Sequence, residues 1–223
     1  MNKLRRINLN DKFTPDTLTI KSTMPSYNTV DMIFANIPRE DLVYIISRMD
    51  LSYKLLKDCG TCIAEVDDRI CGEHFSLHFA LEMISHKWIL RNEIIIYDDI
   101  DGKDKTCFTL NYKKVFFFVK QKKYFFNTQY EKYTKPLGRW GGDFIKEDGN
   151  STWDAGTGQN TTRKRNVRPN KEGKIRRSVW DSNAHPYHII SDACCPAGGR
   201  VVYPFYKVNN EYIYYGVVYD KES

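Results

Sequence analysis

The chain has 223 residues, of which 41% are hydrophobic, so it can bury the core of one domain, or of one domain with a large insertion. The net charge of +6 favours an acidic partner such as nucleic acid. No apolar run approaches membrane-spanning length, and no apolar segment follows the basic start MNKLRRINLN, so we expect neither a membrane partner nor secretion. With no export signal, the six cysteines indicate reduced thiols and a cytoplasmic or nuclear location.

The first part of the chain predicts alternating strands and helices. The run VDMIFA at 30–35 predicts a buried strand, and 40–57 has helical spacing with Gly60 as a candidate C-cap. A strand at 61–66, a helix at 74–87 and an Ile-rich strand at 88–99 follow. Residues 113–127 predict an aromatic strand, a turn and a second short aromatic segment. This order predicts an α/β sheet with helices on its faces.

The composition changes at about residue 134. Residues 134–178 are rich in Gly, Asn, Thr, Lys and Arg, which predicts a long loop or partly mobile insertion. A helix is then predicted over 185–195, behind an N-terminal Pro, and two strands at RVVYPF (200–205) and YIYYGVVYD (212–220). We therefore expect a single domain over 1–223 that carries a basic loop insertion at about 134–178.

Several motifs occur together in one order: the turn after VDMIFA, then WILRNEII, KKVFFFVKQKKYFF and PAGGRVVYPF. In this combination the chain resembles the β-class, circularly permuted amino-methyltransferases of DNA, which modify adenine N6 or cytosine N4. The resemblance implies a Rossmann-like, S-adenosylmethionine-dependent methyltransferase fold, with a mainly parallel sheet flanked by helices. It also implies that the strands at 30–35 and 200–205 are neighbours in the middle of the sheet.

The catalytic turn of that family departs from its pattern in this chain. The family uses Asp or Asn to accept from the target amino group, two prolines to shape the backbone and an aromatic ring to stack on the flipped base. The matching residues are Asn36, Ile37, Pro38 and Arg39. Asn36 and Pro38 fit the motif, whereas Ile37 and Arg39 do not, so the resemblance implies a degenerate catalytic site.

The cofactor loop departs further from the family pattern. Pro204 and Phe205 match the family, and Asp11 or Asp31 is a candidate to help hold S-adenosylmethionine. The glycines expected after Phe205 are absent, and too few residues separate the two last strands for a helix. Val218 stands where the family carries the acid that holds the ribose. We therefore expect no cofactor, with S-adenosylmethionine as the cofactor if the chain is active.

Two further patterns each allow two interpretations. The spacing of Cys59, Cys62, Cys71 and His74 is that of a zinc site, but cysteines at a helix-to-strand turn are more simply core residues, and we predict no metal. Residues 163–177 hold eight basic residues and one Glu, which is typical of either phosphate contact or a solvated loop. We predict DNA contact, by Arg163, Lys164, Arg165, Arg168, Lys171, Lys174, Arg176 and Arg177.

Three functional hypotheses follow. The first is an inactive methyltransferase-like protein that binds DNA or pairs, as a homodimer or heterodimer, with an active methyltransferase subunit. The second is a divergent but active DNA amino-methyltransferase that uses Asn36. The third is an inhibitor or decoy that occupies the dimer surface of a methyltransferase.

Overall fold

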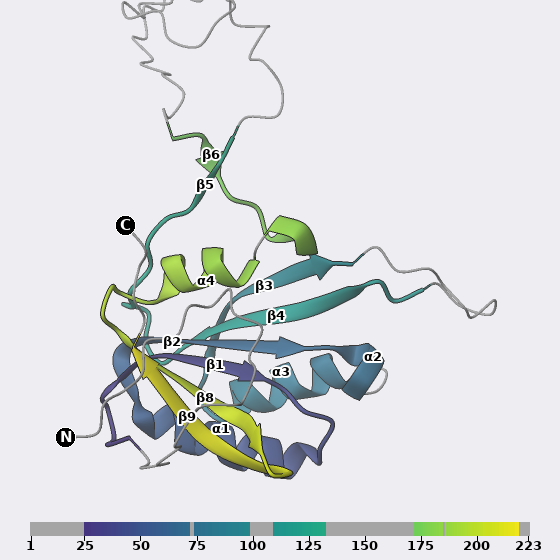
Figure 1. Cartoon of the computed structure of the whole chain (residues 1–223), viewed down its shortest axis with the longest axis vertical. Helices are drawn as coiled ribbons and strands as arrows, with labels where there is room; N and C mark the ends of the chain where they lie inside the picture. The colour runs from purple at the N-terminus through teal and green to yellow at the C-terminus, as the bar shows by residue number, and fades with distance from the viewer. Residues whose placement is uncertain (1–24, 72–73, 99–108, 133–171, 185, 219–223) are drawn as a thin grey trace, which may run out of the picture. The chain divides into compact units, whose positions relative to one another are not determined.

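The computed structural model describes residues 25–71, 74–98, 109–132, 172–184 and 186–218 (Figure 1). The chain divides into two compact units. The larger combines Met1–Asn127 with Arg177–Ser223, and the smaller is Thr128–Arg176. Within the described ranges, no helix has both the length and the apolar character needed to cross a membrane.

The larger unit alternates strands and helices along the chain, as the sequence predicts. Its elements are β1 (Val30–Asn36), α1 (Leu42–Leu55), β2 (Leu56–Val66), α2 (Asp68–Cys71), α3 (Phe75–Ser85), β3 (Ile89–Tyr97), β4 (Tyr112–Val119), β7 (Val179–Asp181), a 3-10 turn (Ser182–Ala184), α4 (Pro186–Cys194), β8 (Arg200–Val208) and β9 (Glu211–Val218).

Among the described residues, this unit holds one sheet of seven strands in the order β7-β3-β4-β2-β1-β8-β9. The pairs β1–β2, β1–β8 and β3–β7 are parallel, whereas β4 is antiparallel to both its neighbours and β9 is antiparallel to β8. Five strands therefore run in one direction, and β4 and β9 run against them. The prediction that the strands at 30–35 and 200–205 are parallel neighbours inside the sheet is confirmed.

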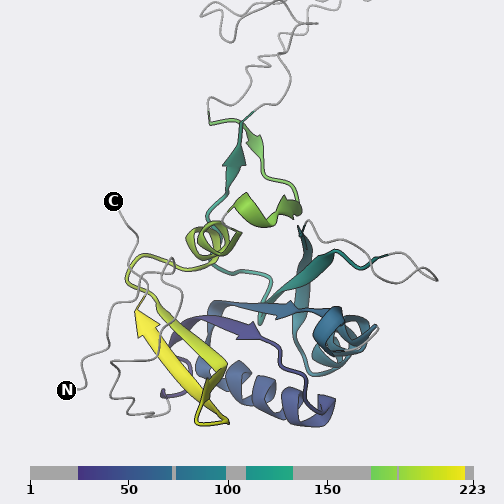
Figure 2. The ribbon, with the colours of Figure 1, turned by 45° about the vertical axis from the view of Figure 1, so that its right-hand side comes forward.

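Helices cover both faces of the sheet, which gives the expected α/β architecture (Figure 2). Successive strand residues point to opposite faces. Ile33 thus packs into the core shared with α1 and α3, and Met32 into the core beneath α4. The three phenylalanines of β4 divide in the same way, since Phe116 and Phe118 face α3 while Phe117 faces α4.

The junction between α1 and β2 differs from the sequence prediction. The carboxylate of Asp41 caps the start of α1 by accepting from the Val43 amide (2.8 Å). The helix ends at Leu55 and β2 begins at once, so Gly60 lies inside β2 and is not the helix cap. A Cβ at Gly60 would lie 2.9 Å from the Asp31 carbonyl oxygen, so glycine is needed there for close strand packing.

The smaller unit contains the short antiparallel pair of β5 (Tyr130–Glu131) and β6 (Lys174–Ile175). Gly173 enters β6 with φ of 117°, and a Cβ there would meet the Glu131 carbonyl oxygen at 2.2 Å. The predicted loop over 134–178 falls mostly on residues 133–171, which lie outside the described ranges. Its end forms β6, a strand that was not predicted from the sequence.

Candidate functional site

The predicted catalytic turn lies at the carboxyl end of β1, in the middle of the sheet. Asn36 is the last residue of β1 and pairs in register with Glu65 of β2. Asn36 and Arg39 are exposed and Pro38 is half-buried. Ile37, which departs from the family motif, is only 4% exposed, and its amide donates to the Glu65 carbonyl (2.9 Å). Ile37 therefore anchors the turn, while Asn36 and Arg39 face solvent.

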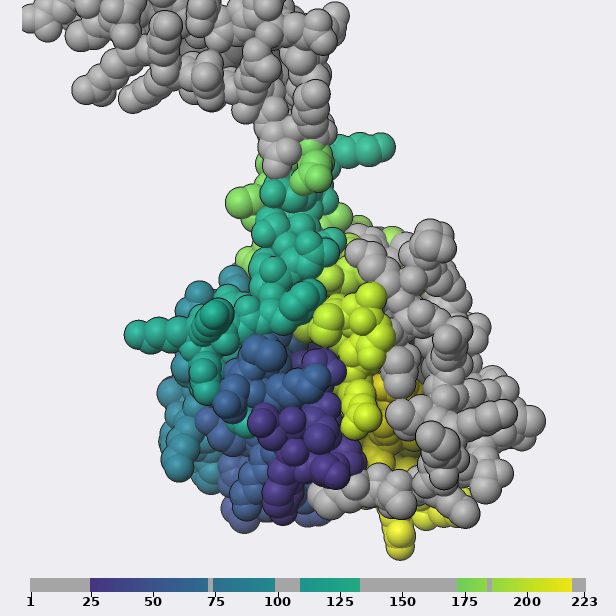
Figure 3. Space-filling view, turned by 90° about the vertical axis from the view of Figure 1, so that its left-hand side faces the viewer, coloured from purple at the N-terminus to yellow at the C-terminus, as the bar shows by residue number. Residues whose placement is uncertain are grey.

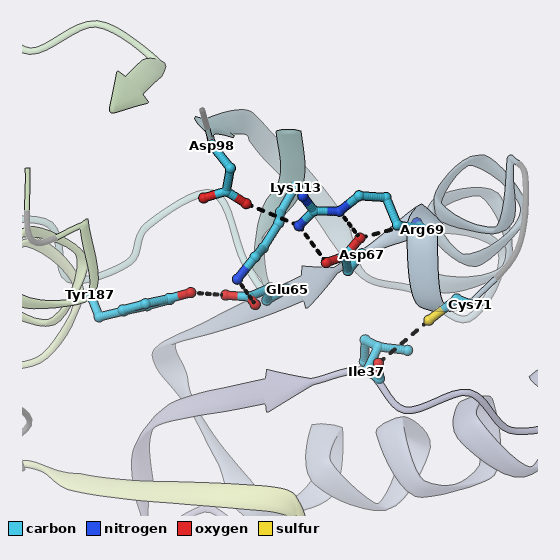
Figure 4. A network of polar contacts seen from close by, with 8 residues as sticks. All are labelled: Ile37, Glu65, Asp67, Arg69, Cys71, Asp98, Lys113 and Tyr187. Carbon is cyan, nitrogen blue, oxygen red and sulfur yellow. Dashed lines mark hydrogen bonds and ion pairs between the residues drawn. The ribbon is translucent and has the colours of Figure 1, made fainter. Parts of the chain in front are cut away.

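A buried carboxylate that was not among the predicted site residues lies beside this turn. Glu65 is 5% exposed at the carboxyl end of β2. One of its oxygens accepts from the Tyr187 hydroxyl of α4, and the other pairs with Lys113 Nζ of β4 at 3.3 Å (Figure 4). Burial, followed by the charge of Glu65 and this hydrogen bond, raises the pKa of Tyr187, so the phenol stays protonated and donates.

A second group of ion pairs follows along the same edge. Arg69 donates to the Asp67 carboxylate (2.6 and 2.8 Å) and to Asp98 at the end of β3 (3.0 Å). Burial acts to raise the pKa of Asp67, but the hydrogen bonds and charge of Arg69, with the charge of Lys113, lower it overall. The same donation to the Asp67 carboxylate is the main cause of the raised pKa of Arg69.

Cys71 closes this edge over the catalytic turn. Its thiol lies 3.6 Å from the Ile37 carbonyl and 3.7 Å from the Pro38 carbonyl. Burial and the nearby charges of Asp68 and Asp67 raise its pKa. Cys71 is therefore a poor nucleophile and a weak hydrogen-bond donor to the turn.

Pro204 and Phe205, which the resemblance implies as cofactor residues, both make contacts with other residues of the protein. Phe205 is 8% exposed and packs edge-on against Tyr212 of β9 (6.1 Å between centroids). The Pro204 carbonyl accepts two hydrogen bonds from the Arg48 guanidinium of α1, at 3.0 and 2.5 Å. That guanidinium also lies over the ring of Tyr214, 4.5 Å from its centroid. Helix α1 and the last two strands thus fill the space beside the carboxyl half of β8 with their own side chains.

A tight hairpin lies where the resemblance implies a glycine loop and a helix. β8 and β9 are antiparallel, and Val208 pairs with Glu211 across the two-residue loop Asn209–Asn210. Both loop residues have positive φ (47° and 66°), as a type I′ turn requires. The predicted absence of a helix between these strands is confirmed. Val218, aligned with the ribose-binding acid, pairs through its backbone with Arg200.

The structure describes one of the two candidate aspartates. Asp11 lies outside the described residues. Asp31 is at the amino end of β1, where one carboxylate oxygen pairs with Lys57 Nζ (2.7 Å) and the other accepts from the Arg200 amide (2.9 Å). Asp31 therefore fastens the start of β8 to the sheet, at the edge opposite the catalytic turn.

The basic stretch lies only partly within the described residues. Arg163, Lys164, Arg165, Arg168 and Lys171 are outside them. Lys174 lies in β6 and pairs with Glu131 of β5 at 3.2 Å, and the Arg176 amide donates to the Gln129 carbonyl (2.9 Å). The exposed Arg177 begins the return to the larger unit, and its carbonyl accepts from the Trp180 indole. Of the described basic residues, Lys174 is therefore already committed to an ion pair.

The cysteines of the zinc-like spacing are distributed along the fold. Cys59 and Cys62 both lie in β2, the first exposed and the second buried, while Cys71 ends α2. Burial raises the pKa of Cys62. Within the ranges that the structure describes, no group of three or more His, Cys, Asp or Glu side chains is placed to hold a metal ion.

No protein-family model matches the sequence, and no curated protein matches it. Solved DNA methyltransferases are similar to it in structure. The cytosine-N4-specific PvuII DNA methyltransferase matches 47% of this chain and 47% of its own, with 11% identity and a TM-score of 0.41. M1.HpyAVI, solved with S-adenosylmethionine, matches 79% of this chain and 70% of its own, with 12% identity and a TM-score of 0.47.

A putative DNA modification methylase from Thermus thermophilus, complexed with S-adenosyl-L-methionine, matches 81% of this chain and 74% of its own. Its identity is 12% and its TM-score 0.43. The chain therefore spans about half of the PvuII enzyme and between two thirds and three quarters of the other two. At this level of identity, the likeness does not extend to activity, substrate or partner.

Proposed function

We propose that this chain is a methyltransferase-like protein that does not transfer methyl groups and acts by binding DNA and pairing with another subunit. The observation that carries the proposal is the β8–β9 hairpin. It occupies the part of the chain where the resemblance implies the loop and helix N-terminus that hold S-adenosylmethionine.

The chemistry of the hairpin does not fit that cofactor. Loops that approach a nucleotide closely need glycine, whereas residues 204–210 contain none. The Pro204 carbonyl is already bonded to Arg48, and Phe205 is buried against Tyr212. A bound cofactor would have to displace these contacts and would still lack a loop of free backbone amides. The residues of this hairpin therefore do not fit S-adenosylmethionine.

The catalytic turn keeps one feature that favours the alternative of a divergent active enzyme. Asn36 is exposed at the carboxyl end of β1 and could accept from an amino group. Arg39 stands where the family has a stacking ring, and a guanidinium can also stack on a base. These two residues could position a base but supply no methyl donor, so the active enzyme is the second candidate.

An assay with labelled S-adenosylmethionine and mixed-sequence DNA separates the two. We expect no label in DNA above a heat-inactivated control. Label that enters DNA with the native chain and is lost in Asn36→Ala would identify an active enzyme. Because Asn36 is exposed, its replacement should leave the fold intact, which circular dichroism checks.

DNA binding is proposed for the basic stretch at 163–177. Replacing Arg163, Lys164, Arg165 and Arg168 with Ala should weaken duplex binding and flatten its salt dependence. Each lost phosphate contact should reduce the slope of log affinity against log salt by about 0.9. A matched control replaces Lys174, whose charge is already paired with Glu131. An unchanged slope in the fourfold variant would make the stretch a solvated surface only.

The pairing surface is proposed on α3. Leu77, Leu81 and Ile84 lie at helical spacing and are 50%, 66% and 47% exposed. Such an exposed apolar stripe marks an interaction surface. His78 and Glu82 are exposed beside the stripe, and the imidazole of one can donate a hydrogen bond to the carboxylate of the other across a pair of helices. In an antiparallel pair of α3 helices, Leu77 would face the partner's Ile84 while His78 faced the partner's Glu82, which favours a second copy as the occupant.

A further inference from the structure

The segment that follows β4 lies at the edge of the sheet opposite the catalytic turn. β4 runs against the parallel strands, so its carboxyl end lies where they begin. Tyr124, Phe125 and Phe126 of this segment, with Arg91 of β3 over the Tyr124 ring, form an aromatic ledge. Its backbone is fixed, because the Phe125 amide donates to the Cys59 carbonyl (2.9 Å) and the Asn127 amide to the Ala193 carbonyl (2.8 Å).

The ledge holds phenylalanine rings in contact with solvent. Phe126 is 49% exposed and Phe125 36% exposed. The Phe126 ring stacks on the buried Phe117, with 5.9 Å between centroids and 25° between planes. Tyr124 meets the same Phe117 edge-on at 5.5 Å. The Phe126 ring is thus supported on its inner side and open on its outer side, and neighbouring exposed apolar rings are typical of a binding surface.

Three cations lie near these rings, one from β3 and two from the turn before them. Arg91 donates from Nε to the Tyr124 hydroxyl (3.1 Å), and its guanidinium lies over the Tyr124 ring at 5.3 Å. Lys122 and Lys123 are exposed in the turn before the ledge. Within the described ranges, none of these three cations is ion-paired with a carboxylate, whereas Lys120, two residues earlier, lies 3.5 Å from Asp58. Figure 3 views this edge of the molecule, where the segment is drawn in teal.

We propose that the aromatic ledge with Lys122 and Lys123 is a binding site for single-stranded nucleic acid. Exposed rings stack on bases whatever their sequence, and neighbouring cations track the phosphates. A duplex buries the faces of its bases inside the helix, so only its phosphates could engage this surface. The site is built from residues outside the basic stretch at 163–177, so it is independent of the duplex binding proposed above.

The test is fluorescence anisotropy with a labelled oligothymidine of about 15 nucleotides. Phe126→Ala removes the ring on which one base would stack, so it should weaken binding roughly five- to a hundredfold. Phe126→Tyr keeps the ring and should bind like the native chain. Replacing both Lys122 and Lys123 with Ala should lower the salt slope by about 1.4, since single strands lose about 0.7 per phosphate contact.

Two controls make the outcome decisive. Lys207→Ala removes an exposed lysine at the opposite edge of the sheet and should leave oligothymidine binding unchanged. The fourfold Arg163, Lys164, Arg165 and Arg168 variant should lose duplex binding and keep most of its single-strand binding, so failure of one proposal is distinguishable from failure of the other. No binding by the native chain, or equal binding by Phe126→Ala, would overturn the site.

Discussion

At the scale of a single residue, the ionisation of the Asp67 carboxylate contributes to the free energy of unfolding. Its pKa is lowered in the folded protein, mainly because Arg69 donates to it from both its side chain and its backbone. A carboxyl group with a depressed folded pKa stabilises the fold above its unfolded pKa, and this contribution is lost as the pH falls through the folded value. Arg69 also bonds Asp98, so the pair ties α2 to the end of β3.

We therefore predict that Asp67→Asn lowers the free energy of unfolding at pH 7 by about 1.5–3 kcal/mol, the usual range for a hydrogen bond to a charged group. The difference from the native chain should be full above about pH 5 and should shrink as the pH falls further. Urea unfolding at several pH values measures it. A difference that stays constant down to pH 2 would show that Asp67 stabilises the fold by packing alone.

At the scale of elements, the spacing of apolar residues predicted α1 and α3, apolar or Ile-rich runs predicted β1 and β3, and the Pro at its start predicted α4. The pair β5 and β6 was missed, since strands of two residues carry no periodicity. The Asn209–Asn210 dipeptide between two strand patterns is a hairpin signal in the sequence, in addition to leaving no room for a helix.

The position of the turn at 36–39 was predictable because its residues are contiguous along the chain and follow β1, whereas its catalytic role stays a prediction. The network around Glu65 was not, because Tyr187 is 122 positions away and Lys113 is 48. An acidic residue inside the otherwise apolar run TCIAEV was the one available signal. A buried carboxylate requires partners, but the sequence does not say which side chains supply them.

The stripe on α3 gives a prediction at the same scale. Leu81→Glu places a carboxylate at the centre of the proposed antiparallel contact, so it should convert a dimer to a monomer without lowering stability, because Leu81 is exposed. Size-exclusion chromatography with light scattering measures the mass.

Val43→Glu is the matched control, since Val43 is equally apolar, 77% exposed and on α1, and it should leave the dimer intact. A native chain that is monomeric at every concentration would contradict pairing between copies. It would direct attention to a different methyltransferase subunit as the partner.

At the scale of the whole molecule, β1 and β8 are neighbours in the sheet, as the resemblance implies. The last strand, β9, differs from that expectation because it follows β8 through a hairpin. β1 and β8 lie side by side and parallel, so the catalytic turn and the end of β8 meet at one edge. β9 then turns back instead of crossing over through a helix. The described sheet thus has the β1–β8 neighbours that the resemblance implies, and it has a hairpin where the resemblance implies a glycine loop and a helix.

Calorimetric titration of the intact chain with S-adenosylmethionine tests this central claim most directly. Two or three missing hydrogen bonds to a buried polar ligand, at about 1–3 kcal/mol each, weaken binding by about a hundredfold or more. We therefore predict no measurable binding at cofactor concentrations up to about 1 mM. Saturable binding with a micromolar Kd would contradict the account, because the hairpin would then have to open or hold the cofactor in a way that its contacts do not allow.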